Sequence, residues 1–432
     1  MRPAFASLVA AIFVAAMLSG AAAENFALRP GIVPDMPDAN TDDTSAPPPR
    51  RVTAASDPYA ALGIRAGGFI LYPSLTIGTG FTTNASASAG GTPSGFGTLT
   101  PELKILSDWD RNAVGLDLKG SYEDFFDGTT PPEPSASAEG TARIDITDQW
   151  TADFAAGATY DEQNVSDPNY PAGADKPPGV IGLTSSADLK GSFGLASFTL
   201  GGSADRNIYE DATSLGALID QGDRNNTDYA GRLRVGYDIT PTLTPFVEGE
   251  VSRRVYDRTI DNTGLQRSGD GYTLRAGVEI EHDPLLRGEI SVGTTHQSFD
   301  DPTLAPLDAL AFDGTLVWAP TRLTTVTFDG STSLQPGDLA TSSGSILYDA
   351  SVDVAYAWRD NITIDLTGAI ENERFQGIGE VDTTYDAGLS ATWKINRTLQ
   401  LTAGYVHEWM DSSDPTLPYQ SDTVKAELRV QR

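Results

Sequence analysis

The sequence predicts an all-β chain that closes into an antiparallel, up-and-down β-barrel spanning a membrane. Apolar residues recur at every second position over segments of ten to fourteen residues, which is the period of a strand with one apolar face. The connections between these segments are alternately short and long, as in transmembrane barrels. We count about eighteen strands, with sixteen as the alternative.

The first alternating row starts near residue 68 and contains Phe69, Leu71, Pro73, Leu75, Ile77 and Phe81. Polar or small residues separate most members of the later rows, which begin at Val114, Trp150, Tyr272, Tyr348, Tyr385 and Leu399. A tilted strand needs about 9–11 residues to cross a bilayer. The predicted strands are therefore long enough to span one.

Eight short connections are predicted, at 107–112, 147–150, 238–242, 282–286, 319–322, 359–361 and 396–398, and near 191–195. Nine other connections are longer and rich in Asp, Asn, Gly and Pro, such as 161–179 and 211–226. An even number of strands places both chain ends on one side of the membrane. By analogy with outer-membrane barrels, that side is the periplasm.

Aromatic residues lie at the ends of several apolar rows, where amphipathic rings suit the boundary between lipid and water. The predicted aromatic girdle consists of Trp150, Tyr160, Tyr348, Trp358, Trp393 and Trp409. A soluble β-sandwich or solenoid is the alternative fold. It explains neither these aromatic ends nor the regular alternation of short and long connections.

The N-terminus has the features of a secretory signal peptide over residues 1–23, with Arg2 followed by an apolar stretch from Leu8 to Leu18. A membrane-anchor helix is the alternative, but the stretch is shorter than the ~20 residues needed to span a bilayer. Residues 24–63 form a Pro- and Asp-rich linker, expected in the periplasm, and 64–432 form the barrel. The mature protein is thus expected to be exported without a transmembrane helix.

Composition excludes several classes of function. The formal net charge is −30, so the phosphates of nucleic acids would be repelled. The chain contains no cysteine, which excludes disulfides, thiolate metal sites, a cysteine nucleophile and a lipidated N-terminal cysteine.

The rows opposite the apolar ones are polar and charged, and in a barrel they line the lumen. The candidate lumen-lining residues are Arg232, Arg234, Glu248, Glu250, Arg254, Arg275, Glu279, Arg287 and Glu289. Opposite charges on neighbouring strands can pair across the wall, and in a water-filled lumen they shape the field met by a solute. The alternative is that they only keep the lumen wet and fix the strand register.

Catalysis finds little support, and we expect no enzyme, cofactor or metal site. The sequence lacks a GxSxG elbow, a P-loop and an HExxH motif. A hydrolase at the barrel rim could use His296 or His407, near Asp300, Asp301 and Glu408. Acidic loops could hold Ca²⁺ through oxygen ligands, but none has a recognised spacing, and solvated loops are the preferred interpretation.

The segment "GIRAGGFILYPSLTIGTGFTTN" (63–84) resembles the first strand of the β-barrel porin group of Gram-negative, rhizobia-like α-proteobacteria, through Gly68, Phe69, Pro73 and Asn84. The resemblance covers about 60–432 and implies a barrel in the cell outer membrane. Members are often linked to exopolysaccharide secretion loci. The partners implied are outer-membrane lipid and lipopolysaccharide, the barrel assembly machinery and polysaccharide secretion proteins.

One feature departs from such barrels, which usually end on an aromatic residue. Here the last outward row is Val424, Ala426, Leu428 and Val430, followed by Arg432.

The function expected is a hydrophilic pore for passive passage or export of solutes, with exopolysaccharide as one candidate. The alternative is a plugged structural or adhesive barrel whose acidic external loops bind a partner.

Overall fold

The computed structural model describes residues 57–432 apart from 129, 164–169, 172, 283 and 338–341. The predicted signal peptide, and the linker up to residue 56, lie outside the described residues. Every regular element in the described part is a β-strand. Among these residues, no helix is long and apolar enough to cross a membrane.

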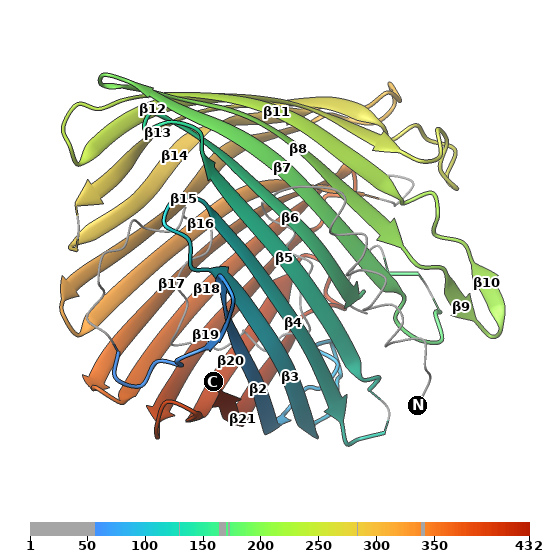
Figure 1. The fold of residues 1–432 in the computed structure, drawn as a ribbon. Helices are drawn as coiled ribbons and strands as arrows, with labels where there is room; N and C mark the ends of the chain where they lie inside the picture. The colour runs from blue at the N-terminus through green and yellow to red at the C-terminus, as the bar shows by residue number, and fades with distance from the viewer. Residues whose placement is uncertain (1–56, 129, 164–169, 172, 283, 338–341) are drawn as a thin grey trace.

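Eighteen long strands form one closed antiparallel barrel, as predicted (Figure 1). They are 12 to 16 residues long. The strands are β2 (Phe69–Thr82), β3 (Ser94–Ser107), β4 (Ala113–Phe125), β5 (Glu133–Asp145), β6 (Trp150–Glu162), β7 (Gly179–Phe193), β8 (Ala196–Tyr209), β11 (Asn226–Tyr237), β12 (Leu243–Tyr256), β13 (Gly269–His282), β14 (Leu286–Gln297), β15 (Leu307–Thr321), β16 (Thr324–Pro336), β17 (Gly344–Arg359), β18 (Ile362–Gln376), β19 (Val381–Lys394), β20 (Leu399–Ser412) and β21 (Tyr419–Gln431).

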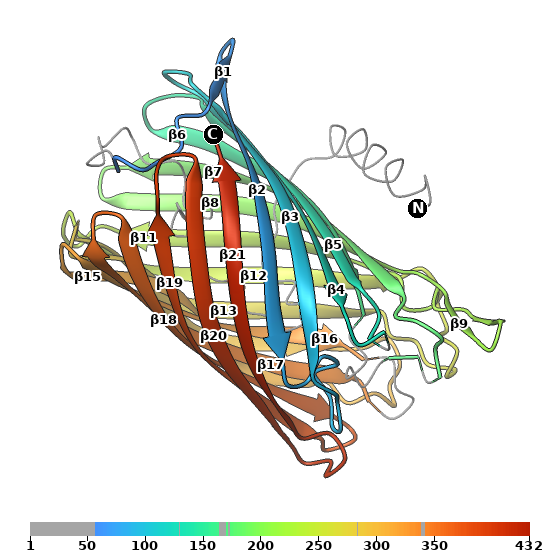
Figure 2. The same ribbon diagram turned by 90° about the horizontal axis from the view of Figure 1, so that it is seen from below.

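The barrel closes where the last strand, β21, pairs with the first long strand, β2. Their register runs from Ser74 opposite Gln431 to Thr82 opposite Thr423. Figure 2 shows the two strands side by side, with the C-terminus at the end of the barrel that carries β1. Closure leaves no free sheet edge, which a lipid-exposed sheet requires because lipid offers no hydrogen bonds.

The short connections gather at one end of the barrel, called the turn end here, and the other connections gather at the loop end. The order of eight short turns and nine loops agrees with the sequence prediction. Two details differ. The turn after β15 lies at 322–323 and not at 319–322, because β15 continues to Thr321 through a register irregularity. The connection between β18 and β19 has only residues 377–380, so this loop is short.

Two small additions extend the barrel. Strand β1 (Ile64–Ala66) pairs with the start of β2 at the turn end. Strands β9 (Ala212–Ser214) and β10 (Ala217–Ile219) form a hairpin inside the connection predicted as an irregular loop at 211–226. The hairpin projects away from the barrel in Figure 1, and the side chain of Leu215 at its tip is 98% exposed.

Apolar side chains lie on the outside of the barrel and not in a central core. Residues such as Leu200, Leu233, Val251 and Leu310 are more than half exposed. In the described part, the one cluster of buried apolar residues is small and consists of Ala85, Phe96 and Phe125. A soluble protein buries most large apolar side chains, so this arrangement fits a barrel whose outer surface is covered by lipid.

Candidate functional site: the charged lumen

The inward face is defined by strand alternation, since successive side chains point to opposite faces of a sheet. On β11 to β13, the outward residues Leu233, Val247 and Leu274 are exposed to 52%, 59% and 55%. The charged residues predicted for these strands occupy the alternate positions. They therefore lie on the inner face of the closed wall.

Arg234 is the centre of the largest group of ion pairs. Its guanidinium lies 2.6 Å from a carboxylate oxygen of Glu289, 3.6 Å from Glu279 and 4.0 Å from Glu248. It also lies 3.4 Å from the ring centroid of Phe246. These carboxylates come from three successive strands beyond β11. A side chain can reach that far round a wall only on its concave side, which places the cluster inside the barrel.

The other three predicted arginines of β11 to β13 also contact carboxylates. Arg275 lies 3.0 Å from Glu248 and 3.5 Å from Asp313 on β15, with β14 between. Arg254 contacts Asp228 at 2.8 Å, and Arg232 contacts Asp188 at 2.6 Å. The guanidinium groups therefore tie together the strands from β7 to β15 along the inner wall.

The Arg232–Asp188 contact crosses the intervening strand β8 at Gly201. The register places Gly201 opposite both residues. A Cβ atom on Gly201 would lie 2.1 Å from Asp188 Oδ1 and 2.9 Å from Arg232 Nε. The missing side chain thus leaves the space through which this ion pair forms.

Seven of the nine predicted lumen residues take part in ion pairs, and two do not. Within the described part of the chain, Glu250 and Arg287 make no salt bridge. Glu250 lies opposite Arg232 in the register, and Arg287 lies opposite Glu281 near the turn end. Sequence reasoning did not select the partners Asp188, Asp228 and Asp313. Their places in the alternating rows were a visible signal, but contacts that skip a strand cannot be read from one strand's pattern.

The aromatic residues predicted as a girdle form two groups at opposite ends of the outward rows. Trp150, Trp358 and Trp393 lie next to the turn end, whereas Tyr160, Tyr348 and Trp409 lie toward the loop end. Other rings extend both groups. Trp150 contacts Phe193 edge-on with ring centroids 5.4 Å apart, and Trp409 stacks on Tyr385 at 5.1 Å.

His296 and His407 are on the outward rows near the loop end, whereas His282 is the last residue of β13, at the turn end. His296 Nδ1 lies 2.8 Å from Asp308, and its ring stacks on Tyr272. His407 Nδ1 lies 2.8 Å from Asp422. Each carboxylate comes from the next strand, not from the neighbours Asp300, Asp301 and Glu408 named from sequence. Among the described residues, no group of three or more His, Asp or Glu side chains is arranged to hold a metal ion.

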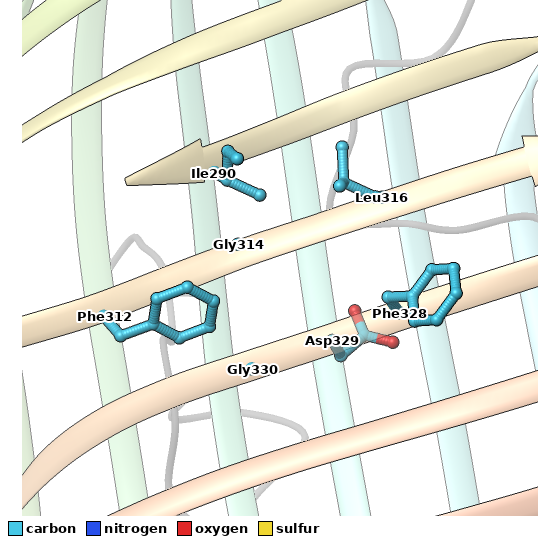
Figure 3. A pocket seen from close by; sticks show the side chains of 7 residues that line it. All are labelled: Ile290, Phe312, Gly314, Leu316, Phe328, Asp329 and Gly330. Carbon is cyan, nitrogen blue, oxygen red and sulfur yellow. The ribbon is translucent and has the colours of Figure 1, made fainter. Parts of the chain in front are cut away.

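A shallow groove of about 370 Å³ lies on the outer surface of β14 to β16 (Figure 3). Gly314 and Gly330 pair across β15 and β16 and form its floor. Figure 3 shows Ile290, Phe312, Leu316 and Phe328 around this floor. Asp329 also borders the groove, although its position in the strand alternation is on the inward row. Because the four side chains around the floor are apolar and face outward, the groove belongs to the lipid-covered surface and not to the polar lumen.

Residues before β1 contact the inner wall at the turn end. Asp57 accepts a hydrogen bond from Lys394 Nζ at 2.7 Å, and Arg397 Nε donates to the carbonyl of Pro58 at 2.7 Å. Partial burial raises the pKa of Asp57, but the bonds from Lys394 and the Tyr59 backbone hold that pKa below its usual value. The chain therefore enters the barrel beside the inward-facing Lys394.

A closed wall with apolar side chains outside, aromatic rings at both ends and charged side chains inside defines a transmembrane β-barrel of the porin class. The chain belongs to the family described as "Putative beta-barrel porin 2", which matches residues 57–432. This membership agrees with the resemblance noted in the sequence. It identifies the chain as an outer-membrane barrel.

Several solved structures are similar in shape. The copper transporter OprC is 9% identical, with a TM-score of 0.46 over 86% of this chain and 81% of that one. A mutant ferric enterobactin receptor PfeA from Pseudomonas aeruginosa is 9% identical, with a TM-score of 0.42 over 84% and 80%. Pseudomonas aeruginosa OpdO is 14% identical, with a TM-score of 0.40 over 84% and 97%. No curated protein matches this chain.

Proposed function

We propose that this barrel is a hydrophilic passage through the outer membrane of a Gram-negative cell, through which solutes move by diffusion. The observation that supports it most is the wall itself. Exposed apolar residues such as Leu233 and Leu274 face outward, while Arg234, Glu248 and Arg275 face inward from the same strands. Charged side chains that line the inside of a barrel keep the lumen hydrated and interact electrostatically with passing solutes.

In this proposal the turn end faces the periplasm and the loops face the outside, since short turns are periplasmic in such barrels. The signal peptide directs export, and the barrel assembly machinery inserts the chain among phospholipid and lipopolysaccharide. The resemblance to porins linked with polysaccharide loci supports an exported polysaccharide as one solute, delivered by secretion proteins. No catalytic step is proposed.

Planar lipid bilayers test the passage. Purified protein whose folding has been checked by its heat-dependent migration in gels should produce stepwise conductance at neutral pH. Liposomes containing it should release trapped small sugars. Folded protein that gives neither current nor sugar flux, both with the loops intact and with 211–220 shortened, would show that the passage proposal is wrong.

A second candidate function is adhesion by a barrel whose lumen is plugged. The β9–β10 hairpin favours it, because Leu215 and Leu218 are exposed to 98% and 67% at the loop end. Exposed apolar residues on a projecting element often mark contact with another molecule. A silent bilayer record combined with surface binding that disappears when 211–220 is shortened would support this function over the passage.

A further inference from the structure

The charges of the inner wall are distributed unevenly around the barrel. On β11 to β13, each of the four inward arginines contacts at least one carboxylate, as described above. Their positive charges are therefore largely balanced within the wall. A solute passing this arc meets paired charges whose fields partly cancel.

The arc of the inner wall formed by β16 to β18 is different, because four of its inward carboxylates form no ion pairs with basic side chains among the described residues. Its inward rows contain Asp329 on β16, Asp349 and Asp353 on β17, and Asp365 on β18. Within the described part, none of these four makes a salt bridge. Three instead accept hydrogen bonds from hydroxyl groups: Asp329 from Thr315 at 2.6 Å, Asp349 from Ser331 at 3.2 Å and Asp365 from Ser390 at 3.5 Å.

A hydroxyl donor stabilises a carboxylate but leaves its negative charge in place. The fourth residue, Asp353, has a buried Oδ2 atom that accepts no hydrogen bond from any described residue. An oxygen in this state lacks compensation for the water it has lost. A cation or its hydration water would supply that compensation.

The strand register adds to the negative charge of this arc. Asp349 on β17 lies directly opposite Glu371 on β18, and like charges in that position destabilise a sheet. Lys394, the inward-facing ammonium of β19, is bonded to Asp57 at the turn end. A mobile cation between β17 and β18 would reduce the repulsion between Asp349 and Glu371.

We infer that the lumen is selective for cations over anions, and that Asp329, Asp349, Asp353 and Asp365 determine this selectivity. The inference rests on the proposed passage and names the class of solute that it prefers. The fixed carboxylates raise the local concentration of cations and lower that of anions. Because the arginine arc is balanced by its own carboxylates, it does not reverse this preference.

The test is the reversal potential of the wild-type barrel in a planar bilayer between two KCl concentrations. We expect a potential whose sign reports preference for K⁺, and we expect it to shrink when both concentrations are raised toward 1 M at a constant ratio. At that ionic strength the Debye length is about 3 Å, against about 10 Å at 0.1 M. A potential near zero, or one that reports preference for Cl⁻, overturns the inference while leaving the passage intact.

The variant D329N/D349N/D353N/D365N removes the four charges with little change in side-chain volume. Its permeability ratio of K⁺ to Cl⁻ should fall several-fold toward unity. The control D110N/D148N/D360N/D411N removes four acids that lie in turns or on the outward face, and it should retain most of the selectivity. If the quadruple variant does not fold, Asp353→Asn alone should lower the ratio. Equal ratios in the variant, the control and the wild type would refute the assignment.

The folding of the wild type and of each variant is checked by the migration of unheated protein in gels. A folded barrel that gives neither current nor sugar flux, with the loops intact and with 211–220 shortened, contradicts the proposed passage. A current without cation preference is a different outcome, which contradicts only the inferred selectivity.

Discussion

Gly201 illustrates how one missing side chain decides a contact between two strands that are not neighbours. Arg232 on β11 and Asp188 on β7 meet at 2.6 Å across the backbone of β8. Any side chain at 201 would point inward, into the space between the two charged groups. At this position a glycine is needed for close approach, and not for an unusual backbone angle.

Gly201→Ala should push the Asp188 carboxylate away from Arg232 and lower the free energy of unfolding by about 1–3 kcal/mol, the usual cost of disrupting a bond to a charged group. Gly231→Ala is the control, because a Cβ atom there meets nothing within 4 Å. Denaturant unfolding of both variants in lipid vesicles measures the difference. Equal stability of the two variants would show that Gly201 does not protect the ion pair.

At the scale of the element, each strand separates two environments with period two. Thr273 and Leu274 are neighbours on β13 but face opposite sides of the wall. Leu274 is 55% exposed on the outside, whereas Thr273 lies opposite Glu250 on the inside. The same substitution at these two positions therefore tests which side faces lipid.

Leu274→Arg should destabilise the barrel by about 2–4 kcal/mol in a bilayer, the cost of an arginine on the lipid face near mid-membrane. Thr273→Arg places the same charge in the lumen, opposite Glu250, and should cost far less. Unfolding by guanidinium in phospholipid vesicles, followed by tryptophan fluorescence, gives both values. In a barrel surrounded by water, the two substitutions would have similar effects.

At the scale of the whole molecule, the two ends of the barrel differ in their aromatic residues. Five of the six tryptophans, namely Trp109, Trp150, Trp318, Trp358 and Trp393, lie near the turn end, and Trp409 lies toward the loop end. The loop end also carries the projecting β9–β10 hairpin. The ends are thus distinguishable, and their orientation in the cell can be measured.

Because the chain has no cysteine, a single introduced thiol reports one position. Leu215→Cys, at the exposed hairpin tip, should react with a membrane-impermeant maleimide on intact cells. Asp148→Cys, in the turn before β6, should react only after the outer membrane is opened. The reverse pattern would place the loops in the periplasm and contradict the proposed orientation.

Much of the architecture was predictable because its signals are local. The alternation from Phe69 to Phe81 gave strand β2, and the polar break at 396–398 gave the turn between β19 and β20. The β9–β10 hairpin was missed because its strands have three residues each, too few for a period to be recognised. The end of β15 was misplaced because an irregular register extends the strand beyond Trp318.

The candidate site was predictable only in part. The inward position of Arg234 follows from the apolar neighbours Leu233 and Val235 on the same strand. Its partner Glu289 lies three strands away round the wall, and His296 bonds Asp308 where sequence proximity pointed to Asp300 and Asp301. Such contacts depend on strand stagger and wall curvature, which no single strand encodes.

The sequence by itself determined which side chains face lipid and which face inward, because strand geometry makes that choice every second residue. It also determined the order of short and long connections. Only the tertiary structure decided which inward charges meet. Closing the sheet brings side chains from β11 to β14 to one point on a concave wall. It leaves Asp329, Asp349, Asp353 and Asp365 of β16 to β18 facing the lumen, and among the described residues none of these four forms a salt bridge with an arginine.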